Sequence, residues 1–136
     1  MGLRNFFLRV KESRIALKHS KNAVGYAGEL IAILILKVKL QKILYHRYKT
    51  YVGEIDIISL RGKSLFFTEV KTSISRRCYA DIPLSSKQRA SILRTAKLFV
   101  FRNPRFRDHE ISFQICRISL HTGIIWIKNA WQDSRW

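Results

Sequence analysis

Two stretches of the chain carry apolar residues at helical spacing. The first runs from about Asn22 to Val38, with Asn22 as its N-cap. Because its apolar residues surround much of its circumference, we expect this helix to be largely buried. The second begins at Ser85 or Ser86, and Pro104 ends it. One face of the second helix is apolar and consists of Ile92, Leu93, Ala96, Phe99 and Val100.

Five stretches have the composition and alternation of β-strands. They are Lys42–Lys49, Gly53–Leu60, Leu65–Thr72, Ile111–Leu120 and Ile124–Lys128. The short turn Arg61-Gly62-Lys63-Ser64 predicts that the second and third strands form an antiparallel hairpin. The order helix, three strands, helix, two strands predicts an α/β fold, with helices flanking a central mixed β-sheet.

A strong excess of basic residues changes this picture from a plain α/β domain to one with a polyanionic partner. Among 136 residues there are 26 Lys and Arg against nine Asp and Glu, a formal net charge of +17. Such a charge favours nucleic acid as the partner, with an anionic membrane surface as the main alternative. Residues 1–21 form a basic arm, which is either a phosphate-contacting extension or a solvated tail. Residues 22–130 then form one domain, and 131–136 form a C-terminal tail.

Cysteine content and apolar runs indicate the compartment. Only Cys78 and Cys116 are present, which favours a reduced, cytoplasmic protein over a disulfide scaffold. The longest uncharged apolar run, Leu30 to Leu36, is far shorter than the ~20 residues that cross a bilayer. The N-terminus lacks the sustained apolar segment of a signal peptide. We therefore expect no membrane span.

The few acidic residues interrupt apolar strands, where an unpaired carboxylate is costly. Asp56 lies in Ile-Asp-Ile-Ile, and Glu69 in Phe-Thr-Glu-Val. If the hairpin turns at Gly62-Lys63, Asp56 lies directly opposite Glu69, and Lys71 lies on the same face. In the same register, Glu54 lies opposite Lys71.

Two facing carboxylates require a positive charge between them. Oxygen ligands favour Mg²⁺ or Mn²⁺, held by Asp56 and Glu69, with Lys71 orienting water or stabilising charge on a phosphate. The alternative is a structural cluster in which Lys71 pairs with both acids. Glu29 follows Gly25 and Gly28, and two helical glycines indicate close approach to a strand or a substrate backbone. We therefore expect Glu29 to reach the metal directly or through water, unless it is simply an exposed acid of the first turn.

Four segments, in this order, resemble the YraN family (UPF0102) of uncharacterised bacterial proteins, within the PD-(D/E)XK nuclease superfamily. They are Gly25–Glu29, Gly53–Ile58, Phe67–Thr72 and Ser85–Arg89. The resemblance implies a restriction-endonuclease-like three-layer sandwich, similar in fold to archaeal Holliday-junction resolvases, with Mg²⁺-dependent phosphodiester cleavage. It places Glu29, Asp56, Glu69 and Lys71 in the catalytic site, and metal on the three acids. Family members usually have Asn-Arg in the strand before Gly-Glu-Ile-Asp, where this chain has His46-Arg47.

A basic stretch follows the strands. From Ile82 to Arg107 there are seven basic residues and no acid, and Lys87 and Arg94 share a helical face. We predict substrate contacts from Arg47, Lys87, Arg89 and Arg94, although Lys87 is equally well explained as a first-turn surface lysine.

Three functions remain open at the level of sequence. The first is a metal-dependent endonuclease acting on DNA, branched or damaged rather than sequence-defined. The second is a nucleic-acid-binding protein with a nuclease fold but no efficient catalysis. The third is a basic membrane-surface or ribosome-associated protein with a structural charge cluster. A homodimer is compatible with each.

Overall fold

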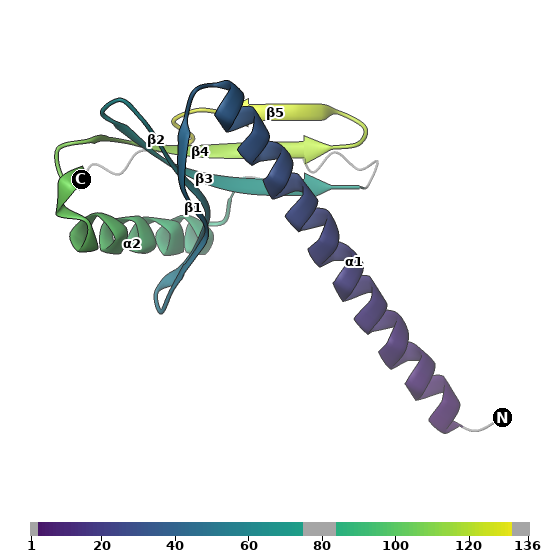
Figure 1. Ribbon diagram of the computed structural model, residues 1–136. Helices are drawn as coiled ribbons and strands as arrows, with labels where there is room; N and C mark the ends of the chain where they lie inside the picture. The colour runs from purple at the N-terminus through teal and green to yellow at the C-terminus, as the bar shows by residue number, and fades with distance from the viewer. Residues whose placement is uncertain (1–2, 75–83, 132–136) are drawn as a thin grey trace.

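The structure is a computed structural model that describes residues 3–74 and 84–131, with side chains described from residue 21 onward. Its centre is a five-stranded sheet in the order β1-β2-β3-β4-β5 (Figure 1). The strands are β1 (Lys42–Thr50), β2 (Gly53–Arg61), β3 (Ser64–Ser73), β4 (Glu110–Ser119) and β5 (Gly123–Ile127). Only β3 and β4 pair in parallel, so the sheet is mixed, as predicted.

Helix α2 (Ser86–Arg102) connects the two parallel strands and covers one face of the sheet (Figure 1). Ser85 is its N-cap, because its hydroxyl accepts from the Gln88 N–H while the Gln88 side chain accepts from the Ser85 N–H. The helix ends at Arg102, and the short 3₁₀-helix η2 (Pro104–Phe106) follows. The main hydrophobic core lies between α2 and the sheet and contains Ile55, Ile58, Leu65, Phe67, Ile92, Ala96, Phe99, Phe106 and Phe113.

Helix α1 (Leu3–Val38) crosses the opposite face, which completes the three layers (Figure 1). The sequence prediction that Asn22 caps this helix is wrong, because the helix runs through that position without a break. Asn is only moderately unfavourable inside a helix, and residues 3–21 contain no Pro or Gly, so the helix continues through this position.

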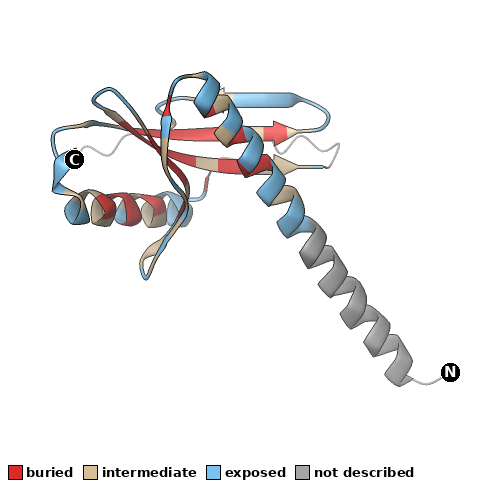
Figure 2. Ribbon diagram, in the orientation of Figure 1, coloured by how far each residue is buried: buried red, intermediate tan, exposed pale blue. Residues whose placement is uncertain are grey.

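The predicted burial of α1 is also wrong. Leu34 is 64% exposed and Val38 is 77% exposed, and exposed residues alternate with buried ones along the helix (Figure 2). The helix packs on the sheet through one narrow stripe, Gly28, Ala32 and Leu36, spaced by four residues. Ala32 and Leu36 contact a second, smaller core around Ile57 and Val70. Among the described residues, no helix is long and apolar enough to cross a membrane.

The hairpin of β2 and β3 has the predicted register, from Arg61 opposite Ser64 to Ile57 opposite Thr68. There the paired ladder ends, because β2 turns away with β1 and the two strands leave the sheet together (Figure 1). The prediction that Glu54 faces Lys71 is therefore wrong. Glu54 lies opposite Lys49 of β1, and their side chains form an exposed ion pair at 3.6 Å.

Gly53 explains why the β1–β2 hairpin leaves the sheet. A Cβ at Gly53 would lie 2.2 Å from Ser91 Oγ and 2.7 Å from Thr95 Oγ1, both on α2. The glycine therefore lets the backbone of β2 press against α2, with φ at 155°. Contact with α2 draws the hairpin away from β3 and opens the sheet at Asp56.

Candidate active site where two strands separate

Asp56 lies just beyond the last paired residues of β2 and β3. Its Oδ2 accepts a hydrogen bond from the Val70 backbone N–H at 2.7 Å. In a longer ladder a backbone carbonyl would accept from such an N–H. The carboxylate thus replaces a missing backbone partner, and the interaction fixes the Asp56 side chain in the gap between the strands.

Glu69 and Lys71 lie on β3, two residues apart, and their side chains meet. Lys71 Nζ donates to Glu69 Oε1 at 2.7 Å, which confirms that they share a face. Their neighbour Val70 points the other way, into the small core under α1. The Glu69 side chain is 15% exposed and that of Lys71 is 42% exposed, so the ammonium is the part of the pair that solvent or a ligand reaches most easily.

Glu29 is carried on α1, and a glycine brings this part of the helix close to β3. A Cβ at Gly28 would lie 2.1 Å from Thr72 Oγ1 and 3.3 Å from Thr72 Cβ. The predicted close approach to a strand is confirmed at Gly28. It is not found at Gly25, where a Cβ would meet no atom within 4 Å. The contact places Glu29, which is only 8% exposed, beside β1.

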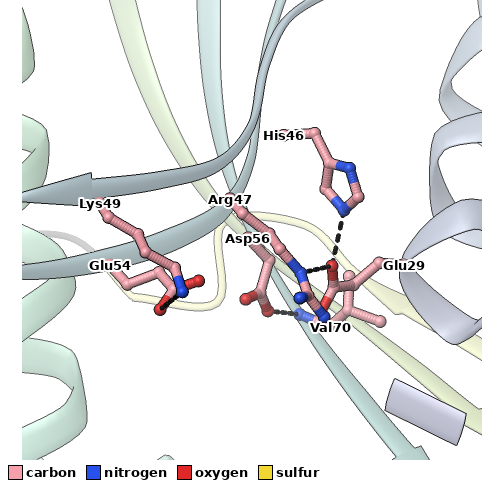
Figure 3. Close-up of polar contacts among 7 residues, drawn as sticks. All are labelled: Glu29, His46, Arg47, Lys49, Glu54, Asp56 and Val70. Atoms are coloured by element: carbon pink, nitrogen blue, oxygen red, sulfur yellow. Dashed lines mark hydrogen bonds and ion pairs between the residues drawn. The ribbon is translucent and has the colours of Figure 1, made fainter. Parts of the chain in front are cut away.

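Two adjacent residues of β1 hold the Glu29 carboxylate (Figure 3). Arg47 Nε donates to Oε2 at 2.8 Å and a terminal Arg47 nitrogen donates to Oε1 at 3.1 Å. His46 Nε2 also lies 2.6 Å from Oε2. Neighbouring residues of a regular strand point to opposite faces, but Arg47 has a φ of 55°, in the left-handed region. This local distortion turns both side chains toward one carboxylate.

His46 is the member of this cluster that sequence reasoning missed. The sequence places it next to Arg47, where alternation predicts the opposite face. No residue type in the strand signals a left-handed φ, which here falls on an arginine rather than a glycine or asparagine. The functional assignment of Arg47 as a substrate contact stays a prediction, since its guanidinium is bonded to Glu29.

The three carboxylates have different electrostatic environments. Burial of Glu29 raises its pKa, but hydrogen bonds and charge interactions with Arg47 and His46 outweigh this and leave the pKa below its ordinary value. Burial, followed by repulsion from Glu69, raises the pKa of Asp56 to about 7. The Val70 N–H and Lys71 oppose this rise only in part. The nearby positive groups therefore do not compensate the burial of Asp56, whereas Arg47 and His46 do compensate that of Glu29.

These environments decide how a divalent cation would fit. Among the described residues, no group of three or more His, Cys, Asp or Glu side chains is arranged to hold a metal ion. Both Glu29 oxygens are already bonded to Arg47 or His46, so Glu29 does not fit as a direct ligand in this arrangement. Asp56 and Glu69 do fit, because among the described residues each uses one oxygen in a hydrogen bond, Asp56 Oδ2 and Glu69 Oε1. Mg²⁺ commonly binds one or two carboxylates plus waters and phosphate oxygens.

The predicted substrate-binding residues of α2 lie on its surface. Lys87, Arg89 and Arg94 are all exposed. Lys87 and Arg94 are two helical turns apart and share a face, as the sequence predicts. The apolar residues Ile92 and Phe99 are buried on the opposite side, against the sheet. A basic surface is therefore present on α2, and its contact with nucleic acid stays a prediction.

The two ends of the chain lie partly outside this description. The side chains of the basic arm and residues 132–136 of the predicted tail, including Trp136, fall outside the described residues. Trp131 belongs to the domain, because its ring stacks on Phe113 with centroids 5.1 Å apart.

Together, fold and site define a basic three-layer α/β protein with an acid–lysine cluster at the point where two central strands separate. The profile of the uncharacterised protein family UPF0102 matches residues 28–119. A UPF0102 protein of Ehrlichia ruminantium is 46% identical over 112 residues, covering 82% of this chain and 86% of that protein. One from Ehrlichia chaffeensis is 45% identical over 112 residues, covering 82% and 89%. A UPF0102 protein of Francisella tularensis is 33% identical over 109 residues, covering 79% and 92%. The chain belongs to the UPF0102 family.

Proposed function

We propose that this protein is a metal-dependent endonuclease that hydrolyses phosphodiester bonds in DNA. The observation that carries the proposal is the pair Asp56 and Glu69 at the separation of β2 and β3, with Lys71 beside it. A purely structural ion-pair cluster would neutralise its acids. Here Lys71 is hydrogen-bonded to Glu69, and burial and repulsion from Glu69 raise the pKa of Asp56 to about 7. A divalent cation would supply the missing charge.

Asp56 and Glu69 would hold Mg²⁺ or Mn²⁺, which when bound polarises the scissile phosphate and lowers the pKa of the attacking water. The Val70 N–H fixes the orientation of Asp56, so the carboxylate needs no rearrangement to meet a cation. Lys71 donates one hydrogen bond to Glu69. An ammonium has three donors, so others can contact the phosphate or the water and stabilise negative charge that develops there.

Glu29 contributes to this proposal as a positioning residue rather than as a direct ligand. It shares the surroundings of Asp56, whose pKa it raises through charge repulsion. The Arg47 guanidinium and His46 compensate the charge of the Glu29 carboxylate and hold this side chain in place. Direct coordination by Glu29, which the family resemblance implies, would require the Arg47 bonds to open.

DNA is the proposed substrate because the charge of the chain is +17 and the basic side chains of α2 are exposed. Backbone contacts of this kind fix a duplex without reading its sequence, which suits branched or damaged DNA. The proposal implies that the protein works in the cytoplasm, where bacterial DNA is accessible.

A second candidate is a nucleic-acid-binding protein of this fold without efficient turnover. The specific observation in its favour is that Glu29 is already neutralised by Arg47, while Glu69 is paired with Lys71. In that case the cluster would be a structural one, and nucleic acid would bind without being cut.

Cleavage of branched, nicked and single-stranded DNA over a Mg²⁺ and Mn²⁺ titration separates the two. The proposal predicts metal-dependent cleavage that falls at least about 100-fold in Asp56→Asn and in Lys71→Met, with DNA binding retained. Lys63→Met is the matched control, since Lys63 is an exposed lysine in the β2–β3 turn. Binding without cleavage across these substrates supports the second candidate. Cleavage that persists in Asp56→Asn contradicts the assigned site.

A further inference from the structure

A polar cavity of about 200 Å³ lies on the α1 side of the sheet, where α1 ends and β1 begins. Its walls come from the α1–β1 connection and from the ends of β2, β3, β4 and β5. Phe66 lines it and lies four residues before Val70 on β3, so both point to the same face. The cavity shares no lining residue with the acid–lysine cluster.

Two buried carboxamides form part of the cavity. Gln41 is 6% exposed, and its Oε1 accepts from Ser59 Oγ at 2.7 Å. Gln114 is 1% exposed, and its Oε1 accepts from Trp126 Nε1 at 3.1 Å. The Trp126 indole N–H can only donate, so its bond identifies the oxygen of the Gln114 amide and leaves the nitrogen as the donating end.

Asn129 adds a third carboxamide at the end of β5. Its Oδ1 accepts from Ser112 Oγ at 2.8 Å. Ser112 is itself buried in the cavity wall. Three amides with their oxygens already bonded give a wall that is rich in hydrogen-bond donors.

The cavity also carries an excess of positive charge. Lys39, Arg61 and Lys128 line it, against one acid, Glu110. Two of these cations are oriented by aromatic rings. Lys39 Nζ lies 4.3 Å from the ring centroid of Trp126, and the Arg61 guanidinium lies 5.9 Å from that of Phe66.

We propose that this cavity is a nucleotide subsite that receives one unpaired nucleotide of a DNA strand. Amide donors suit the carbonyl and ring-nitrogen acceptors of a base, and the cations suit its phosphate. The volume is below the roughly 300–1,000 Å³ of common small-molecule pockets, so it fits a single base with its backbone left at the mouth. The inference rests on the proposed function only in taking nucleic acid as the partner.

The subsite would also narrow the substrate class of the proposed nuclease. Phe66 and Glu69 are three residues apart on β3, so the cavity and the Glu69–Lys71 pair lie on opposite faces of the sheet. The subsite would therefore act on substrate choice by binding an unpaired segment, apart from the place of cleavage. DNA with an unpaired segment is then preferred over a fully paired duplex.

The test is fluorescence anisotropy with a labelled single-stranded oligonucleotide and a blunt duplex of the same sequence, both in EDTA. The variant is Asn129→Asp, which exchanges an exposed amide donor for a charged acceptor of the same shape. An aspartate also tolerates the left-handed φ of 46° at this position. Asn22→Asp is the matched control, because it makes the same charge change at an exposed position of α1.

We expect Asn129→Asp to weaken single-strand binding at least about tenfold and duplex binding by less than about threefold, with Asn22→Asp close to wild type. Equal losses for the two DNA forms, or no loss, would overturn the subsite. If deoxynucleoside monophosphates bind as tightly as the oligonucleotide, the cavity is a site for a free nucleotide and not for part of a DNA strand. That result would also overturn the proposed subsite. Because EDTA removes cleavage from the experiment, the subsite and the nuclease proposal can fail separately.

Discussion

Replacing Asp56 by Asn tests the electrostatics of the site without requiring any substrate. The exchange removes the charge but keeps an oxygen that can accept the Val70 N–H, now 2.7 Å from Asp56 Oδ2. In the folded protein, burial and the nearby Glu69 raise the pKa of Asp56 from 3.8 to about 7. The ionised form is therefore less favourable in the folded state than in the unfolded chain.

The sign of the pH effect follows from this. Between about pH 4 and pH 7 the folded protein binds more protons than the unfolded chain, so Asp56 lowers stability as the pH rises through this window. Each tenfold change in proton affinity corresponds to about 1.4 kcal/mol, which gives at most about 4 kcal/mol of destabilisation at pH 8. Asp56→Asn should therefore be the more stable protein at pH 8 without metal, and should differ little from wild type near pH 4.

The assay is chemical denaturation of both proteins across this pH range, with EDTA and then with Mg²⁺. The quantity of interest is the difference in free energy of unfolding between the two proteins, because all their other titrating groups are the same. Mg²⁺ should stabilise the wild-type protein at pH 8 and leave Asp56→Asn unchanged. A variant that is less stable than wild type at pH 8 in EDTA would refute the assignment of an uncompensated charge to Asp56.

Two further predictions concern packing and cysteine reactivity. Gly28→Ala should lower the free energy of unfolding by about 1–3 kcal/mol, because its Cβ would lie 2.1 Å from Thr72 Oγ1. Gly25→Ala, in open space on the same helix, should raise it by up to about 1 kcal/mol, and equal effects in denaturant titrations would contradict the close approach. Burial raises the pKa of the Cys116 thiol to about 11, so in Cys78→Ser protein this thiol should react with a disulfide reagent at pH 8 much more slowly when folded than when denatured. Similar rates would show that Cys116 is accessible.

The sequence predicts the β2–β3 hairpin well because the register of a hairpin is determined by residues close together in the chain. A short turn sets the register, and counting outward from Arg61 and Ser64 correctly places Ile57 opposite Thr68. The same count places Asp56 opposite Glu69, but the paired ladder ends one pair earlier, at Ile57 and Thr68, and Asp56 instead accepts from the Val70 N–H. The shared face of Glu69 and Lys71 follows from strand alternation.

The features that sequence reasoning missed depend on contacts between distant segments. The end of the ladder at Asp56 follows from Gly53 meeting α2, about forty residues later in the chain. The exposed face of α1 arises because the helix meets the sheet along one stripe, and no other described element covers its far side. The contact of both His46 and Arg47 with Glu29 depends on a left-handed φ at Arg47, for which the local sequence gives no signal.

The most direct test of the central claim, a cation site where β2 and β3 separate, is Mn²⁺ binding measured by electron paramagnetic resonance. The wild-type protein should bind Mn²⁺ saturably, and both Asp56→Asn and Glu69→Gln should weaken binding at least about tenfold. Glu110→Gln, which removes an exposed carboxylate elsewhere on the sheet, should bind like wild type. Equal Mn²⁺ affinity for wild type and Glu69→Gln would contradict a cation site at the point where β2 and β3 separate.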